Sequence, residues 1–146
     1  MLTYEVTSDR TRMDVDAIHA FLSQTYWSPG IPKTVVEKAI NNSICVGAFQ
    51  SGQQVAFARV VTDAATFAYL ADVYVLEEHR GQGVSRMILE KIFGHPELQG
   101  LRRFMLATRD AHDLYARYGF KLLTNPGRMM EIHNPNAYLF SGASDA

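Results

Sequence analysis

Two glycines between a β-prone segment and a helical pattern are the first sign of chemistry in this chain. They are Gly81 and Gly83, within the run Arg80–Ser85. Backbone N–H groups of such a loop converge at the positive end of the following helix, where a diphosphate can accept several hydrogen bonds without a metal ion. Glycine also lets the backbone approach the phosphates closely. A glycine pair in this place can equally form a tight turn that binds nothing, so the loop alone leaves both interpretations open.

Comparison with known phosphate loops narrows the choice of ligand. The loop lacks the Lys-Ser or Lys-Thr pair of nucleoside-triphosphate loops, and Arg86 stands where a dinucleotide-binding loop has its third glycine. It instead resembles the loop of the GCN5-related N-acetyltransferases (GNAT), whose pattern is Gln or Arg, two variable residues, Gly, one variable residue, then Gly or Ala. Ser85 departs from this pattern but is small enough to fit. The preceding strand, the following helix and the later segment Ala111–Phe120 resemble the family in the same order, from about Tyr4 to Ile132.

The resemblance implies acetyl-CoA as the co-substrate. In similar enzymes the strand before the loop diverges from its neighbour, so that its free backbone groups pair with the pantetheine arm, and an unpaired strand edge does need such a partner. Many relatives also carry an Asn seven residues before a catalytic tyrosine, where this chain has a threonine. The coenzyme-binding residues that the resemblance implies are Val73, Tyr74, Val75, Arg80, Gly81, Gln82, Gly83, Val84, Ser85 and Thr108.

Tyr115 and Asp72 stand at positions for which the resemblance implies catalysis. Tyr115 lies where relatives place the tyrosine that protonates the departing thiolate, and a phenol with a reference pKa near ~10 is protonated at neutral pH. The implied reaction is direct attack by a neutral amine on the thioester, with the oxyanion held by the N–H of Val73. Asp72 is the carboxylate expected to accept the amine proton or to hold the ammonium group. By residue type alone, Tyr115 could be a packing residue and Asp72 a structural carboxylate.

The acceptor pocket is expected beside the only tryptophan. Tyr26 and Trp27 lie between two predicted helices, in a region that overhangs the acceptor pocket in similar enzymes. They could form an aromatic wall for a small amine or anchor the loop by packing. Arg59 and Tyr138 are further candidates for the same pocket. The implied function is N-acetylation of a small-molecule or peptide amine, and the alternative is a module that binds an acyl-CoA without turnover, as a sensor or regulatory subunit.

Composition argues against several other classes of protein. The chain has 146 residues, of which 47% are hydrophobic and 20% charged, and its formal net charge of -1 provides no basic excess to neutralise nucleic acid. No apolar run approaches the ~20 residues of a membrane-spanning helix, and the first residues lack the pattern of a secretory signal. The single cysteine, Cys45, lies in an apolar segment and is expected to be buried, while the five histidines lack metal-ligand spacing. We therefore expect a cytoplasmic protein with no metal, nucleic-acid or membrane partner.

The hydrophobic periodicity predicts a single α/β domain over residues 1–146, with helices flanking a mixed, mostly antiparallel central sheet. This is the fold of GNAT-like acyl-CoA N-acyltransferases. Asp14 should cap the first helix and Gly119 end the last, and the expected helices are 14–25, 32–40, 84–93 and 111–118. The expected strands are 3–7, 44–49, 54–62, 66–75, 101–107, one that begins at Phe120, and an edge strand at 128–132. Residues 141–146 are expected to fray, and the apolar residues 138–140 could join a homodimer interface.

Overall fold

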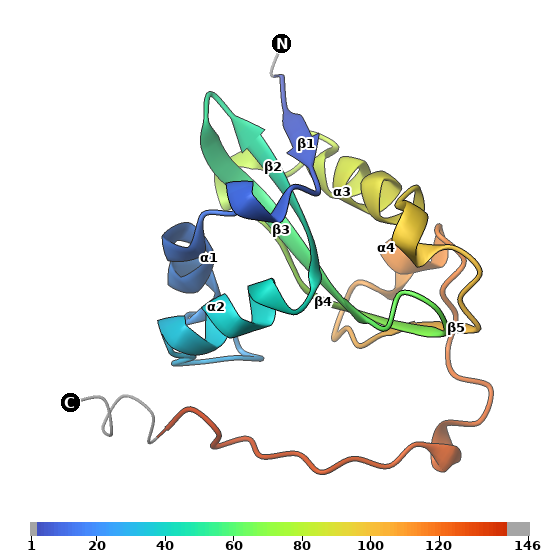
Figure 1. The fold of residues 1–146 in the computed structure, drawn as a ribbon. Helices are drawn as coiled ribbons and strands as arrows, with labels where there is room; N and C mark the ends of the chain where they lie inside the picture. Colours follow the sequence, from blue (N-terminus) through green and yellow to red (C-terminus); the bar gives the residue numbers. More distant parts are fainter. Residues whose placement is uncertain (1–2, 140–146) are drawn as a thin grey trace.

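The central sheet has five strands, and their order across the sheet is their order along the chain (Figure 1). The computed structural model describes residues 3–139, so the predicted tail at 141–146 lies outside the described residues. The first four strands pair antiparallel with one another, whereas the fifth strand runs parallel to the fourth. The mixed, mostly antiparallel sheet predicted from the sequence is confirmed. Its strands are β1 (Glu5–Thr7), β2 (Ile44–Gln50), β3 (Gln53–Thr62), β4 (Phe67–Val75) and β5 (Arg103–Leu106).

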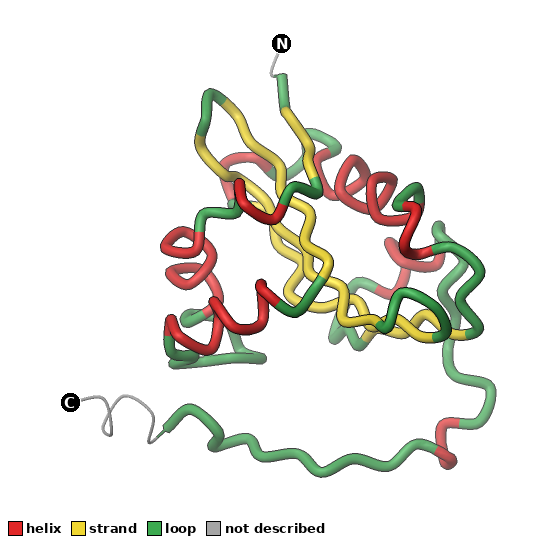
Figure 2. The backbone as a smooth tube through the Cα atoms, in the orientation of Figure 1, coloured by secondary structure: helices red, strands yellow, loops and turns green. Residues whose placement is uncertain are grey.

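Helices cover both faces of the sheet (Figure 2). They are α1 (Val15–Leu22), α2 (Lys33–Asn41), α3 (Val84–Phe93) and α4 (His112–Ala116). Successive side chains of a strand point to opposite faces, so Cys45 of β2 packs with Ile18 under α1 and α2, and Val46 packs with Ile88 of α3 on the other side. Burial raises the pKa of the Cys45 thiol to about 11. The expectation that this cysteine is a buried, unreactive residue is consistent with its place in the core.

The predicted helix starts agree with the structure better than the predicted ends. Asp14 caps α1, because its carboxylate accepts the N–H of Ala17 at 3.1 Å. The helix ends at Leu22 rather than at Thr25, since the Thr25 hydroxyl donates to the Leu22 carbonyl at 2.7 Å and closes a local turn instead. Gly119, with φ of +96°, turns the chain after α4 as predicted. None of the helices within residues 3–139 is both long and apolar enough to cross a membrane.

The prediction of the last two strands is wrong for the described residues. Neither the segment from Phe120 nor residues 128–132 forms a strand, and 121–137 are exposed throughout. We name residues 121–139 the C-terminal arm. Figure 1 shows the arm leaving the body beyond α4 and running along the molecule as a long extended segment. A strand forms only where a second backbone supplies its hydrogen bonds, and within the described residues no neighbouring strand lies beside the arm.

Gln54 fixes the start of α1 against the sheet. This glutamine is only 4% exposed. Its Oε1 accepts the N–H of Asp14 at 2.8 Å, and its Nε2 donates to the carbonyl of Ala56 at 3.1 Å. A buried amide with both ends paired holds two elements in a single register. The helix that precedes the Tyr26–Trp27 loop is therefore positioned by a side chain of β3.

Replacing Gln54 by Leu should destabilise the fold by about 1–3 kcal/mol, because the N–H of Asp14 and the carbonyl of Ala56 would both lose the partner that this buried amide supplies. Urea unfolding of the purified protein measures this change. Gln53, the preceding residue on β3, is exposed, so Gln53→Leu is the matched control and should stay within about 0.5 kcal/mol of the parent. Equal unfolding midpoints for the two variants would contradict the assigned role of Gln54.

Candidate active site

A cleft of about 700 Å³ lies between the α1–α2 loop, the middle of β4 and the loop from β5 to α4. Its lining combines aromatic rings, charged groups and strand backbone from segments that are far apart in the sequence. The residues predicted for the site that the structure brings together here are Tyr26, Trp27, Arg59, Asp72, Val73, Thr108, Tyr115 and Tyr138. Lining residues that the sequence analysis did not select include Tyr69, Arg109 and Asp110.

The sheet opens beside this cleft. Pairing between β4 and β5 ends at Leu70 and Leu106, yet β4 continues to Val75. The N–H of Leu76 donates to the carbonyl of Val55 on β3 at 2.8 Å. Because backbone groups alternate in direction along a strand, those of Val75 and Val73 point away from β3 and toward the opening. This geometry agrees with the expectation that β4 diverges from its neighbour at these two valines.

A β-bulge in β4 sets the position of Asp72. The register with β3 shifts between Phe57 and Arg59, which pair with Tyr74 and Ala71, so that β4 has one more residue than β3 in this interval. Asp72 adopts a φ of +56°, a left-handed conformation that Asp tolerates better than most residues. A bulge of this kind bends the strand and redirects a side chain. The residue pattern gave no sign of the bulge, because the segment reads as a continuous strand.

Asp72 is the centre of a polar network at the base of the cleft. One carboxylate oxygen accepts the indole N–H of Trp27 at 2.9 Å, and the other accepts Nε–H of Arg59 at 2.9 Å. Arg59 also donates from Nη1 to the hydroxyl of Ser43 at 3.2 Å. The side chains of Arg59 and Asp72 are 19% and 11% exposed. The pair therefore joins the α1–α2 loop, β3 and β4, and Ser43 is a supporting residue that the sequence analysis missed.

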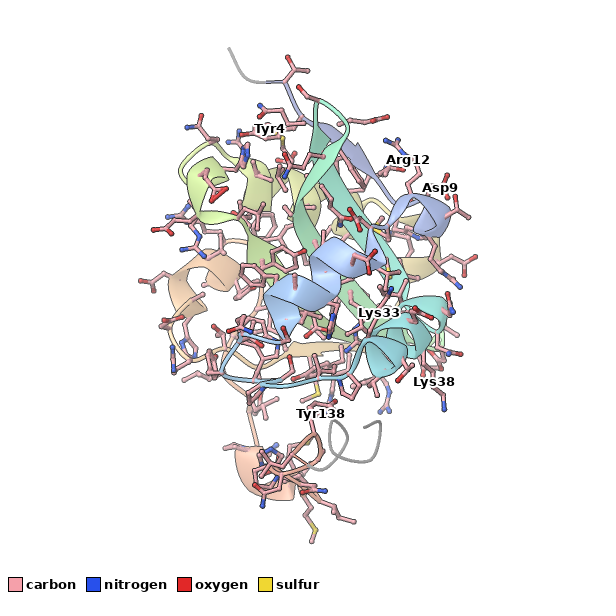
Figure 3. The ribbon with its side chains drawn as sticks, turned by 90° about the vertical axis from the view of Figure 1, so that its left-hand side faces the viewer. Tyr4, Asp9, Arg12, Lys33, Lys38 and Tyr138 are labelled. Carbon is pink, nitrogen blue, oxygen red and sulfur yellow. The ribbon has the colours of Figure 1, made fainter. Side chains whose placement is uncertain are left out.

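Aromatic and cationic groups form the mouth of the cleft. The rings of Tyr26 and Trp27 meet edge to face with centroids 5.1 Å apart, and both side chains are well exposed. The guanidinium of Arg109 lies 3.9 Å from the centre of the Tyr26 ring, which is the geometry of a cation–π contact. Tyr138, at the end of the arm (Figure 3), also lines the cleft. Its carbonyl oxygen lies near Gly30, at 3.9 Å from the position that a Cβ on this glycine would occupy. The loop that carries Trp27 thus contacts both the arm and the segment after β5.

Tyr115 and Thr108 lie on the side of the cleft formed by α4 and the segment before it. Tyr115 is buried, its ring meets that of Phe120 edge to face, and burial raises the pKa of its phenol. The phenol is therefore protonated throughout the neutral range. The Thr108 hydroxyl accepts the N–H of Ala111 at 3.0 Å and closes the turn that leads into α4. The Thr108 side chain therefore already makes a hydrogen bond within the fold, to the backbone of Ala111.

The glycine loop lies outside the lining of the cleft, at the end of β4. Gly81 and Gly83 have φ values of +76° and +80°, and Gly83 is the residue directly before α3. No side chain caps α3, so the first N–H groups of this helix are available to an anion. On the approach to the loop, His79 Nδ1 lies 2.9 Å from the hydroxyl of Tyr4. Arg80 Nε donates to the Val75 carbonyl at 3.1 Å.

Tyr74 is the predicted coenzyme-binding residue whose side chain lies apart from the others. Its ring stacks on Phe21 of α1 with centroids 3.9 Å apart and belongs to the core under α1 and α2. Burial raises the pKa of the Tyr74 phenol, with Asp14 and Asp72 adding to the shift. Alternation along β4 puts the Tyr74 side chain on the face covered by α1, so it packs there while the backbone of Val73 and Val75 borders the opening.

A sheet that opens beside a glycine loop and a tyrosine-lined cleft defines the class of protein, an acyltransferase. The family model for the acetyltransferase (GNAT) domain matches residues 41–122. A protein of Gibberella zeae whose name marks it as a candidate acetyltransferase is 34% identical, and the match covers 78% of this chain and 76% of the relative. This chain belongs to the GNAT acetyltransferase family.

Solved structures show the same fold. A candidate GNAT acetyltransferase from Xanthomonas campestris is 52% identical, with a TM-score of 0.92, and the match covers 94% of this chain and 98% of that one. A candidate acetyltransferase from Clostridium acetobutylicum, solved with acetyl-CoA, is 17% identical with a TM-score of 0.67, and the match covers 91% of this chain and 96% of that one. The predicted GNAT fold is confirmed.

The contact between Arg59 and Asp72 should be worth about 1–3 kcal/mol, because both charges are largely removed from water. A double-mutant cycle with Arg59→Gln and Asp72→Asn, followed by urea unfolding, measures the coupling, and Asn tolerates the left-handed backbone of position 72. The surface pair Lys33–Asp16, with side chains 47% and 81% exposed, is the control. The matching cycle, with Lys33→Gln and Asp16→Asn, should give a much smaller coupling, because water screens the exposed pair. Similar couplings for both pairs would show that the cleft network does not hold its elements together.

Proposed function

We propose that this protein transfers the acetyl group of acetyl-CoA to an amine by direct attack, with no covalent enzyme intermediate. The observation that carries the proposal is the open edge of β4 beyond Leu70, which runs from the glycine loop to the cleft lined by Tyr115. An extended pantetheine chain has amide groups that can pair with such an edge as an added strand would. The Clostridium acetobutylicum relative, solved with acetyl-CoA, supports the choice of co-substrate.

The coenzyme would be held mainly by backbone. Both backbone groups of Val73 and the N–H of Val75 face the opening, while Arg80 already occupies the Val75 carbonyl. The N–H groups at the start of α3 would bind the pyrophosphate, and Gly81 leaves room for it, because a Cβ there would meet nothing within 4 Å. Gln82 and Ser85 complete the proposed pyrophosphate loop. The residues present therefore fit a coenzyme bound along β4 with its diphosphate at the end of α3.

Three groups of the chain would act on the reacting atoms. Bound acetyl-CoA supplies an activated acyl carbon and a thiolate leaving group. The N–H of Val73, at the open edge, is placed to stabilise the oxyanion. The Tyr115 phenol would give its proton to the departing sulfur. Asp72 would hold the incoming ammonium group and take its proton, because each of its oxygens keeps a lone pair beyond those that bind Trp27 and Arg59.

The acceptor proposed from the cleft is a small amine with an apolar or aromatic portion. Tyr26 and Trp27 offer flat apolar surface at the mouth, and such rings bind a small ligand with little loss of side-chain freedom. Arg59 lines the cleft and uses two of its N–H groups in the network, so that others are left for a polar group of the acceptor. The amine would enter from this side, opposite the coenzyme.

Acetyl-CoA should bind the parent protein at micromolar strength or tighter, and Gly83→Asp should abolish binding, because a carboxylate would occupy and repel the diphosphate site. Isothermal titration calorimetry measures this. Gly100→Asp is the matched control, since Gly100 also has positive φ and open space around it but lies before β5. If the parent binds neither acetyl-CoA nor free coenzyme A, the proposed function fails.

Tyr115→Phe should lower kcat about 10²-fold while leaving acetyl-CoA affinity unchanged, because only the proton donor to sulfur is lost. Steady-state assays with a panel of small amines, monitored by thiol release, measure the effect. Rates for the parent should rise with pH as the amine loses its proton and should fall only at a pH above the ordinary pKa of a phenol, because burial raises the pKa of the Tyr115 phenol.

Tyr118→Phe makes the same change on a tyrosine that stacks on Phe93 and does not line the cleft, and it should keep the parent rate. A Tyr115→Phe enzyme with full activity would remove Tyr115 from the chemistry. Coenzyme binding with no turnover of any amine in the parent would instead favour a non-catalytic acyl-CoA-binding module.

A further inference from the structure

The charges that line the cleft limit which amines it can bind. Asp72 already shares its negative charge with Arg59, whose Nε lies 2.9 Å from one of its carboxylate oxygens. An ammonium group on Asp72 would therefore lie close to the guanidinium too, and two positive charges at that range repel each other. Arg109 and Asp110 also line the cleft, but both are exposed, so water screens their charges. An amine with no other charge would gain little from this cleft.

Arg59 keeps hydrogen-bond donors that the polar network does not use. Its Nε donates to Asp72 and its Nη1 to Ser43, and within the described residues these bonds leave Nη2 without an acceptor. Every fully buried side-chain nitrogen or oxygen in that part of the chain has a hydrogen-bond partner, so Nη2 must be reached by solvent. Because Arg59 lines the cleft, an anionic group of a bound molecule can meet these free donors there.

The places for an ammonium and for an anion lie side by side. The nitrogens of one guanidinium share a single carbon, so the free Nη2 of Arg59 is next to the Nε that binds Asp72. A molecule that meets both side chains must carry its positive and negative charges on neighbouring atoms. An α-amino acid does so, because its ammonium and its carboxylate are bonded to the same carbon. A planar carboxylate is also the anion that suits the fork of a guanidinium.

Flat apolar surface borders the same place. The indole N–H of Trp27 donates to Asp72 at 2.9 Å, so the ring begins where the ammonium would lie. Trp27 is 44% exposed, and Tyr26, which meets it edge to face, is 57% exposed. A side chain on the α-carbon of the bound molecule would lie against these rings. A large apolar side chain would gain the most, because it removes its own surface and that of the rings from water.

We propose that the acceptor is a free α-amino acid with a large apolar side chain, its carboxylate bound by Arg59 and its ammonium by Asp72. This assignment rests on the proposed function and names its substrate class. In the bound state each charge lies beside charges of the opposite sign, and the carboxylate offsets the repulsion between the ammonium and Arg59. The amino terminus of a peptide lacks this carboxylate, since the corresponding carbon belongs to an amide.

Transfer to such an acceptor releases one proton. The ammonium gives one proton to Asp72 and from there to solvent, and the free nitrogen then forms a bond to the acetyl carbon. The C–S bond breaks with its electron pair on sulfur, which takes the phenol proton of Tyr115. The nitrogen loses a second proton as it becomes an amide, and this proton restores the phenol. The products are an N-acetyl amino acid and the free thiol.

Paired substrates test the role of the carboxylate. The preferred substrate among leucine, methionine, phenylalanine and tryptophan should have a kcat/KM about 10- to 100-fold above that of its own amide, which keeps the amine and the side chain but lacks the negative charge. Steady-state assays of thiol release measure the ratio. An equal or higher kcat/KM for the amide overturns the proposal and leaves the proposed function standing. A protein that binds acetyl-CoA but acetylates none of the four also overturns it, whereas failure to bind acetyl-CoA overturns the proposed function itself.

Arg59→Gln should abolish the preference for the amino acid over its amide, chiefly by raising KM for the amino acid. Structural damage would lower both rates alike, so the ratio reports on the carboxylate alone. Arg103→Gln, which changes an exposed arginine of β5 outside the cleft, is the matched control and should keep the ratio of the parent. A preference that survives Arg59→Gln, or that is lost in Arg109→Gln instead, would overturn the assignment of Arg59.

Discussion

The geometry of the site depends on the loss of β5 as a neighbour of β4 beyond Leu70. A strand that ends its pairing inside a fold leaves N–H and C=O groups that need other partners. Asp72, in a left-handed conformation, bends β4 at this point, and the strand then runs on to the glycine loop at the start of α3. The opening, the anion-binding loop and the cleft are therefore parts of one backbone arrangement.

The polar network around Asp72 connects this backbone feature to the acceptor side of the molecule. Its carboxylate accepts hydrogen bonds from Trp27 of the α1–α2 loop and Arg59 of β3. Gln54 fixes the start of α1, the helix that precedes this loop, against β3. A bulge that redirects one side chain thereby orients the aromatic mouth of the cleft as well as the strand edge.

The sequence predicts a strand at residues 128–132 of the C-terminal arm, and this prediction is wrong, because Arg128 ends a short 3-10 helix and no strand forms there within the described residues. Met129 is extended, but a strand is defined by its pairing, and within residues 3–139 no strand pairs with this segment. The arm leaves the edge of β5 open and returns to its own body at Tyr138, which lines the cleft.

The sequence by itself determined the element order as far as α4, the helix start at Asp14, the span of α3 and the glycine loop before it, because these depend on local periodicity, capping and backbone freedom. It also selected eight of the residues that line the cleft, through a resemblance carried by the loop and by Tyr115. Only the tertiary structure decided the bulge at Asp72, the bonds to Ser43 and Trp27, the contact of Arg109 with Tyr26, and the separation of the arm from β5. These features arise from contacts between segments far apart in the chain, and no local pattern specifies which distant backbone or side chain will meet them.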